Sequence, residues 1–136
     1  MNKKILTTAL LAGFVGAAHA QSSVTLYGLI DTGFTYVNHA GAKAQHLYYY
    51  NDGVAQGSRW GLRGSEDLGG GLKAIFVLEN GFNAGTGALG QGNSLFGRQA
   101  FVGLTKNGIG SLTFGRQYSF STDYLGGSDA NGGQTV

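Results

Sequence analysis

The sequence contains no cysteine and no proline, and only 12% of its 136 residues carry a charged side chain. Without cysteine, the chain forms neither a disulfide framework nor a thiolate metal site. No apolar run reaches the ~20 residues that a membrane-spanning helix needs, although 42% of the residues are hydrophobic. The apolar residues are therefore dispersed along the chain, and the period of their dispersal indicates the class of fold.

The charge balance gives no support to nucleic-acid binding. The formal net charge is +2, from nine basic and seven acidic residues. Two of the basic residues, Lys3 and Lys4, lie in an N-terminal segment that we expect to be removed. Seven basic residues then balance the seven acidic ones, so no basic patch for a nucleic-acid partner is expected.

The first twenty residues have the pattern of a secretory signal peptide. A short basic start, Met1–Lys4, precedes an uncharged stretch over residues 5–18, and Ala18-His19-Ala20 is a small-x-small cleavage site. The apolar stretch is too short to span a bilayer comfortably, and no stop-transfer charges follow it. We therefore expect residues 1–20 to be cleaved before Gln21 and the protein to leave the cytoplasm.

After Gln21 the apolar and polar residues alternate with a period of two. Along Ser23–Val37 the even-numbered positions are mostly apolar and the odd-numbered ones are mixed and polar, as for a strand between two unlike media. The same alternation recurs four times downstream, and no amphipathic helix is expected. The predicted strands are Ser23–Val37, Ser58–Ser65, Leu72–Phe82, Leu95–Leu104 and Ser111–Tyr118.

The connections between these strands alternate between long and short. Asn38–Gly57 and Phe82–Ser94 are long and rich in glycine, whereas Glu66–Gly71 and Thr105–Gly110 are short turns. Outer-membrane barrels have this layout, with tight periplasmic turns, longer outer loops and aromatic residues at the lipid interfaces. Soluble sandwiches also alternate, but they bury the apolar face against a second sheet. Aromatic residues of the apolar parity cluster near the long-loop ends, namely Phe34, Tyr36, Trp60, Phe82 and Phe96. We therefore predict an all-β fold, a transmembrane antiparallel β-barrel.

Four segments, in order, resemble the trimeric general-diffusion porins of Gram-negative bacteria. They are Ser23–Gly33, similar to the first strand; Ser58–Ala74, to the second strand, turn and third strand; and Gly97–Leu104 and Gly110–Tyr118, to strands four and five. The resemblance implies about sixteen strands around an aqueous channel. Residues 21–136 would then be the N-terminal part of the barrel and hold roughly its first five strands. The resemblance also implies that Ser119–Val136 begins the third loop, which folds inward and constricts the pore.

The polar parity supplies the residues that we expect to line the pore. A lumen that carries both signs of charge orders water and sorts solutes by charge. The basic residues of this parity outnumber the acidic ones, which predicts a mild preference for anions. The predicted pore-lining residues of this parity are Arg59, Arg63, Lys73, Asp31 and Glu79.

Two further arginines, Arg98 and Arg116, have the apolar parity. By resemblance, Arg59 and Arg98 fall where the family places arginines of its pore constriction, so Arg98 is also predicted to line the pore. Two alternatives stay open for Arg98 and Arg116. Either a bulge redirects their side chains toward the lumen, or they emerge above the lipid and bind lipopolysaccharide phosphates. Val77 departs from the family pattern, which often has a polar residue at this lumen-facing position.

No active site is apparent. Gly85–Gly90 matches the pattern GxGxxG, but a dinucleotide site needs a following helix, so we expect a glycine-rich loop. His39 and His46 share a long loop with Asp52, and two histidines in a loop do not make a metal site. We expect no enzymatic activity, no cofactor and no metal.

The expected function is passive diffusion of small hydrophilic solutes and ions through an outer-membrane channel. The resemblance implies a homotrimer in contact with outer-membrane lipids and lipopolysaccharide. An alternative is a barrel that acts as an adhesin or surface-binding protein through loops such as Asn38–Gly57. An enzyme carried on a small barrel would require catalytic residues beyond Val136.

Overall fold

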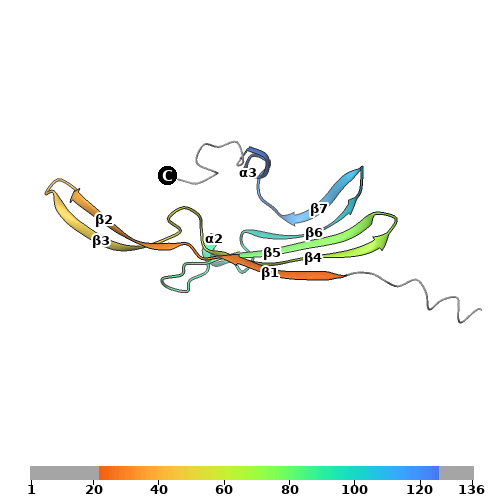
Figure 1. Cartoon of the computed structure of the whole chain (residues 1–136), viewed down its shortest axis with the longest axis horizontal. Coiled ribbons are helices and arrows are strands. Elements are labelled where there is room, and N and C mark those ends of the chain that lie inside the picture. The colour runs from red at the N-terminus through yellow and green to blue at the C-terminus, as the bar shows by residue number, and fades with distance from the viewer. Residues whose placement is uncertain (1–21, 126–136) are drawn as a thin grey trace, which may run out of the picture.

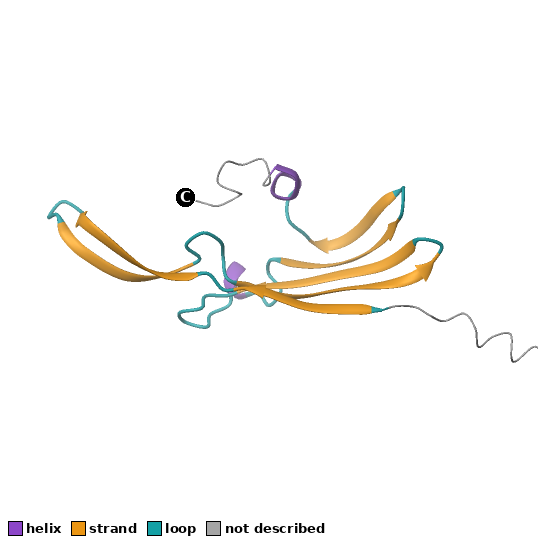
Figure 2. Ribbon diagram, viewed as in Figure 1, coloured by secondary structure: helices purple, strands orange, loops and turns teal. Residues whose placement is uncertain are grey.

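The computed structural model describes residues 22–125, and its regular structure is almost entirely antiparallel strands (Figures 1 and 2). This confirms the predicted all-β class. The strands are β1 (Ser23–Leu29), β2 (Thr32–Ala40), β3 (Gln45–Asp52), β4 (Arg59–Gly69), β5 (Leu72–Gly81), β6 (Gln99–Lys106) and β7 (Gly110–Arg116). The predicted signal peptide and its cleavage site lie outside the described residues, as do residues 126–136 of the predicted third loop.

Two short helices, which the sequence did not predict, lie in connections. They are α2 (Gly90–Asn93) and α3 (Phe120–Leu125). Within α2, Gln91 and Gly92 have left-handed backbone angles, so this segment is a coiled turn more than a regular helix. No helix in the described part of the chain is long and apolar enough to cross a membrane.

Five strands form one antiparallel sheet in the order β1-β4-β5-β6-β7, and β2 and β3 form a separate hairpin. In Figure 1 this hairpin extends away from the end of the five-stranded sheet. The single strand predicted over Ser23–Val37 is therefore wrong. β1 pairs with β4 as far as Leu29, and from Thr32 the chain pairs with β3 instead. The predicted loop Asn38–Gly57 likewise contains most of a hairpin.

Two other predicted boundaries move for local reasons. β4 continues past Ser65 to Gly69 through a bulge, and the turn to β5 narrows to Gly70 and Gly71, both with positive φ. β6 begins four residues later than predicted, at Gln99. Phe96 has a φ of 57°, a left-handed conformation that cannot continue a strand.

The register keeps residues of one parity on one face across the whole sheet. Apart from Gly69–Leu72 and Ala40–Gln45, which follow register shifts, every strand pair joins residues of equal parity, as in Thr25–Arg63 and Val77–Phe101. We call the two faces of the five-stranded sheet the even face and the odd face. One row of the even face runs through Val24, Gly64, Phe76, Val102 and Phe114. The grouping of residues by parity is therefore confirmed.

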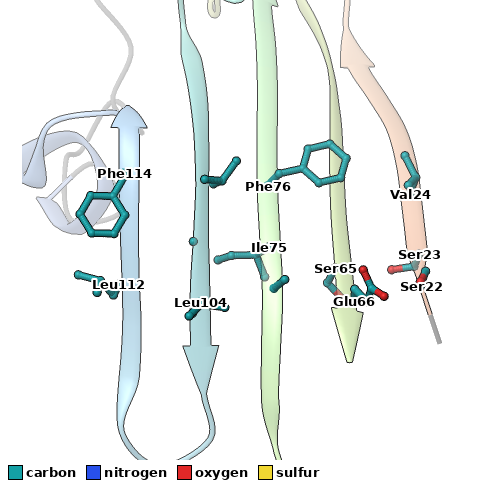
Figure 3. A pocket seen from close by; sticks show the side chains of 13 residues that line it. Ser22, Ser23, Val24, Ser65, Glu66, Ile75, Phe76, Leu104, Leu112 and Phe114 are labelled. Carbon is teal, nitrogen blue, oxygen red and sulfur yellow. The ribbon is translucent and has the colours of Figure 1, made fainter. Parts of the chain in front are cut away.

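The sheet has no apolar core. Over residues 22–123, where side chains are described, no apolar side chain is buried, and the buried polar residues are Ser58, Glu79 and Asn80, each 2–4% exposed. The even face instead exposes large apolar side chains at 37–69%, namely Val24, Leu26, Trp60, Val102, Leu104, Leu112 and Phe114. A shallow apolar groove of about 510 Å³ lies among several of these side chains (Figure 3). The five strands therefore form an open sheet with an exposed apolar face, not a globular domain with an apolar core.

Candidate functional site

Two charged residues of the odd face, Arg59 and Glu79, lie toward the end of the sheet that carries the long connections. Arg59 begins β4, and Glu79 lies near the end of β5 beside it. Lys73 lies at the opposite end, paired in register with Asp67. Of the six residues predicted to line a pore, Lys73 is therefore the one that the fold places apart.

Glu79 is the centre of a buried polar cluster. Its carboxylate accepts hydrogen bonds from Arg98 Nε (2.7 Å) and from the Tyr27 hydroxyl (2.8 Å). The Tyr118 hydroxyl also donates to Glu79, and Arg98 Nε lies 2.9 Å from that hydroxyl. Because a buried charge is tolerated only when it is paired and hydrogen-bonded, these donors are what keep the carboxylate inside the wall. The structure thus brings together two predicted residues, Glu79 and Arg98.

Tyr27 reaches Glu79 because a glycine separates them. The register places Tyr27 opposite Gly61, and Gly61 opposite Glu79, on three adjacent strands. A Cβ atom at Gly61 would lie 2.8 Å from the Tyr27 hydroxyl, so any side chain there would block the phenol. Tyr27 and Tyr118 are not among the residues that the sequence predicted to line a pore. The parity of Tyr27, equal to that of Glu79, was a signal that could have drawn attention to it.

Arg98 is redirected to the odd face. It follows Phe96, whose left-handed backbone breaks the alternation before β6 begins. The Arg98 N–H donates to the Glu79 carbonyl (3.2 Å), and its guanidinium carbon lies 5.4 Å from the centre of the Tyr118 ring. Of the two alternatives for Arg98, the structure therefore supports redirection toward the polar side.

Arg116 is not redirected in this way. It ends β7 on the even face, in register with Ala100, and it is exposed. Its Nη1 atom donates to the Gly97 carbonyl at 2.9 Å. Arg98 and Arg116, which share a parity in the sequence, thus leave the sheet on different sides.

Arg63 lies over the same tyrosine that binds Glu79. Its guanidinium carbon is 5.4 Å from the centre of the Tyr27 ring, and the Arg63 side chain is exposed. A cation over an aromatic face at an exposed site gains ~0.5–1 kcal/mol. Tyr27 therefore touches the buried Glu79 through its hydroxyl and the exposed Arg63 through its ring.

Asp31 and Arg59 are connected through Gln56. Asp31 Oδ2 accepts the backbone N–H groups of Gln56 (2.6 Å) and Ala55 (2.7 Å), and Arg59 Nη2 donates to Gln56 Oε1 (2.6 Å). Arg59 Nη1 also donates to the Gly57 carbonyl (3.2 Å). These N–H groups, that of Gln56 first and that of Ala55 second, lower the pKa of the Asp31 carboxyl from its usual 3.8. The Asp31 carboxylate thus holds the connection between β3 and β4.

The remaining polar motifs of the sequence lie in the β2–β3 hairpin and in the connection that contains α2. The Tyr36 hydroxyl and His46 Nδ1 lie 2.7 Å apart in the exposed hairpin. Within residues 22–125, no group of three or more histidine, cysteine, aspartate or glutamate side chains is placed to hold a metal ion. Of the loop predicted over Gly85–Gly90, residues 85–89 lie outside any helix or strand, and Gly90 begins α2. The left-handed angles inside α2 leave no regular helix N-terminus to receive a pyrophosphate.

Comparison with known proteins matches this chain to one family. A family model described as Gram-negative porin matches residues 7–136. An outer membrane porin protein of Bordetella pertussis is 50% identical over 97% of this chain and 37% of its own length. Outer membrane porin protein 32 of Delftia acidovorans is 45% identical over 85% of this chain and 32% of its own length.

A solved structure gives the same result for the fold. The anion-selective porin from Comamonas acidovorans matches with a TM-score of 0.70 and 37% sequence identity. The match covers 85% of this chain and 34% of that porin. This chain therefore spans about a third of the length of these relatives.

Proposed function

The chain belongs to the Gram-negative porin family, and from this membership we propose that it forms the first part of the wall of an outer-membrane channel. Small hydrophilic solutes and ions diffuse passively through this channel. The observation that carries the proposal is the contrast between the two faces. The even face exposes large apolar side chains, whereas the odd face carries the charged cluster, and the sheet has no apolar core of its own. Lipid on one side and water on the other satisfy both faces.

In this proposal the odd face lines the lumen and its arginines set the selectivity. Glu79 and Arg98 form a salt bridge at 2.7 Å, so their charges largely cancel. Arg59 and Arg63 then dominate the local field, since Lys73 lies at the other end of the sheet opposite Asp67, and a low-dielectric wall concentrates this field in a narrow passage. A mild preference for anions follows, and the name of the anion-selective porin from Comamonas acidovorans is consistent with it.

In this proposal the even face meets outer-membrane lipids and neighbouring copies in a homotrimer. Arg116, exposed at the end of β7, is suited to lipopolysaccharide phosphates. Residues 1–20 are cleaved as a signal peptide during export, which places Gln21 at the mature N-terminus. N-terminal sequencing of the envelope protein checks this, and a mature chain that retains Lys3 and Lys4 would contradict it.

The channel is favoured over an adhesin because the matching relatives are named as porins. It requires no cofactor and no covalent chemistry. Conductance in planar bilayers tests the proposal. The complete barrel that contains these strands should give discrete single-channel steps whose size grows with salt concentration. A folded barrel that inserts but does not conduct would support the surface-binding alternative instead.

A further inference from the structure

Three segments of the chain meet where the β2–β3 hairpin leaves the five-stranded sheet. They are the bend at residues 30–31, the connection at residues 53–58, and residues 82–84, which follow β5. Ser58, 2% exposed, lies at their junction, and its Oγ is 3.1 Å from both the Asp31 nitrogen and Asp52 Oδ1. Asp52 Oδ1 also accepts the N–H of Ala84 at 3.1 Å. The junction therefore fixes the connection that precedes β4.

Within this junction the Asp31 carboxylate has a geometry that a lumen charge would not need. One oxygen, Oδ2, accepts both the Ala55 and the Gln56 N–H groups. This holds the backbone of Gln56, whose side-chain oxygen in turn accepts Arg59 Nη2 at 2.6 Å. Hydrogen bonds thus connect three residues in series. The Asp31 carboxylate binds the backbone N–H of Gln56, and the side-chain oxygen of Gln56 binds the Arg59 guanidinium.

We propose that Asp31 is a positioning residue that fixes the Arg59 guanidinium through Gln56. The sequence alone predicts for Asp31 only the role of a negative charge that lines the pore. The two roles differ in what they require of the side chain. A pore charge needs the negative charge itself, whereas positioning needs only an oxygen that accepts the two N–H groups. This proposal rests on the proposed channel function, because Arg59 matters through its charge at the lumen.

The test compares Asp31→Asn with Asp31→Ala in the complete barrel. Both variants remove the same charge, but the asparagine side-chain oxygen can still accept both N–H groups. Positioning predicts that Asp31→Ala has a lower anion-to-cation permeability ratio than Asp31→Asn, measured from reversal potentials. It also predicts that this difference disappears in an Arg59→Ala background. Equal ratios for the two single variants would overturn the positioning of Arg59.

A second measurement does not depend on conduction. Amide hydrogen exchange at Ala55 and Gln56 should be about tenfold faster in Asp31→Ala than in Asp31→Asn, because the acceptor of both N–H groups is lost. Equal exchange rates in the two variants would show that the Asp31 carboxylate does not hold the Ala55 and Gln56 N–H groups. A wild-type barrel that does not conduct would overturn the proposed channel. The exchange rates would still test whether Asp31 holds the Ala55 and Gln56 N–H groups.

Gln56→Met provides a variant that keeps Asp31 and its two N–H partners. Methionine has a similar length but no amide oxygen for Arg59. This variant should lower the anion-to-cation ratio as Asp31→Ala does relative to Asp31→Asn, while the exchange rate at Ala55 stays at the wild-type value. Gln56→Met therefore tests the contact between Gln56 and Arg59 even if the Asp31→Ala barrel does not assemble. A wild-type ratio in Gln56→Met would contradict the path through Gln56.

Discussion

Glu79 is the residue on which the charged cluster depends. The residue is 4% exposed, and its carboxylate accepts hydrogen bonds from two tyrosines and Arg98. Replacing it with glutamine would leave the Arg98 charge without its counter-charge. Because leaving a partly buried charge unpaired is costly, we expect Glu79→Gln to lower the free energy of unfolding by ~1–3 kcal/mol. If the odd face lines the lumen as proposed, the anion-to-cation permeability ratio should rise, since one negative charge is removed from that face.

Heat-induced unfolding of the complete barrel and its reversal potential measure these two effects. Glu66→Gln is the matched control, because Glu66 is exposed and lies at the other end of β4. The control should leave both quantities near the wild-type values. A Glu79→Gln barrel as stable and as selective as the control would show that the buried cluster has no role in either property.

Gly61 tests the route by which Tyr27 reaches Glu79. A Cβ atom at this position would lie 2.6 Å from the Leu78 carbonyl oxygen and 2.8 Å from the Tyr27 hydroxyl. We expect Gly61→Ala to displace the phenol and to lower the free energy of unfolding by about 1–3 kcal/mol. Because Tyr27→Phe removes the same hydrogen bond, the two effects should not add in the double variant. If the losses in free energy of unfolding add fully, Gly61→Ala does not act through the hydrogen bond between Tyr27 and Glu79.

Asp31 should titrate below the usual range of an aspartate. The N–H groups of Gln56 and Ala55 stabilise its charged form and lower the pKa of the carboxyl from 3.8. A group with a lowered folded pKa contributes stability above its unfolded pKa and loses that contribution as the pH falls through the folded value. The NMR shift of the Asp31 carboxyl carbon in the folded barrel measures this. A midpoint at or above 3.8 would contradict the two hydrogen bonds.

At the scale of elements, the sequence was sufficient to predict which residues share a face of the sheet. It was not sufficient to predict which strands pair. Alternation with a period of two is a local property, and the register preserved it across five strands. The change of partner after Leu29 depends on the distant β3 and β4, so no local pattern shows it. The β-prone run Leu47–Tyr50 was the available sign of β3. In the hairpin it supports Tyr48 opposite Tyr36 and Tyr50 opposite Phe34.

The aromatic residues predicted to cluster near the long-loop ends lie in different parts of the fold. Trp60 and Phe96 do contact each other, with ring centres 6.0 Å apart. Phe34 and Tyr36 instead belong to the projecting hairpin. The orientation of Arg98 was also beyond prediction from parity, because it depends on the left-handed backbone of Phe96. A bulky residue rarely adopts that conformation, so the sequence gives no local sign of it.

Spin labels on the strands test the assignment of the two faces. Labels at Leu26, Phe76 or Val102, on the even face, should be relaxed by oxygen dissolved in lipid. Labels at Lys73 or Thr113, on the odd face, should be relaxed by water-soluble reagents. Electron paramagnetic resonance of the complete barrel measures both accessibilities. The reverse pattern would mean that the odd face meets lipid, and the proposed pore-lining residues would then be wrong.

At the scale of the whole molecule, the absence of an apolar core is the informative feature. A soluble domain of this length buries a large part of its apolar surface, yet no apolar side chain is buried over residues 22–123. The composition already indicated this arrangement, since 42% hydrophobic residues were spread without a long run. The sequence therefore predicted the architecture of the wall better than the contacts of its charged residues. Those contacts depend on tyrosines and backbone N–H groups contributed by neighbouring strands and connections.

In the proposed channel the odd face lines the lumen, and its arginines favour anions. Reversal potentials across a salt gradient, measured on the complete barrel in planar bilayers, test it most directly. The wild type should prefer anions, and this preference should weaken as the Debye length falls from ~10 Å at 0.1 M to ~3 Å at 1 M salt. Arg59→Ala should lower the anion-to-cation permeability ratio more than Arg116→Ala, because Arg116 ends β7 on the even face. An Arg59→Ala channel with the wild-type ratio would contradict the claim.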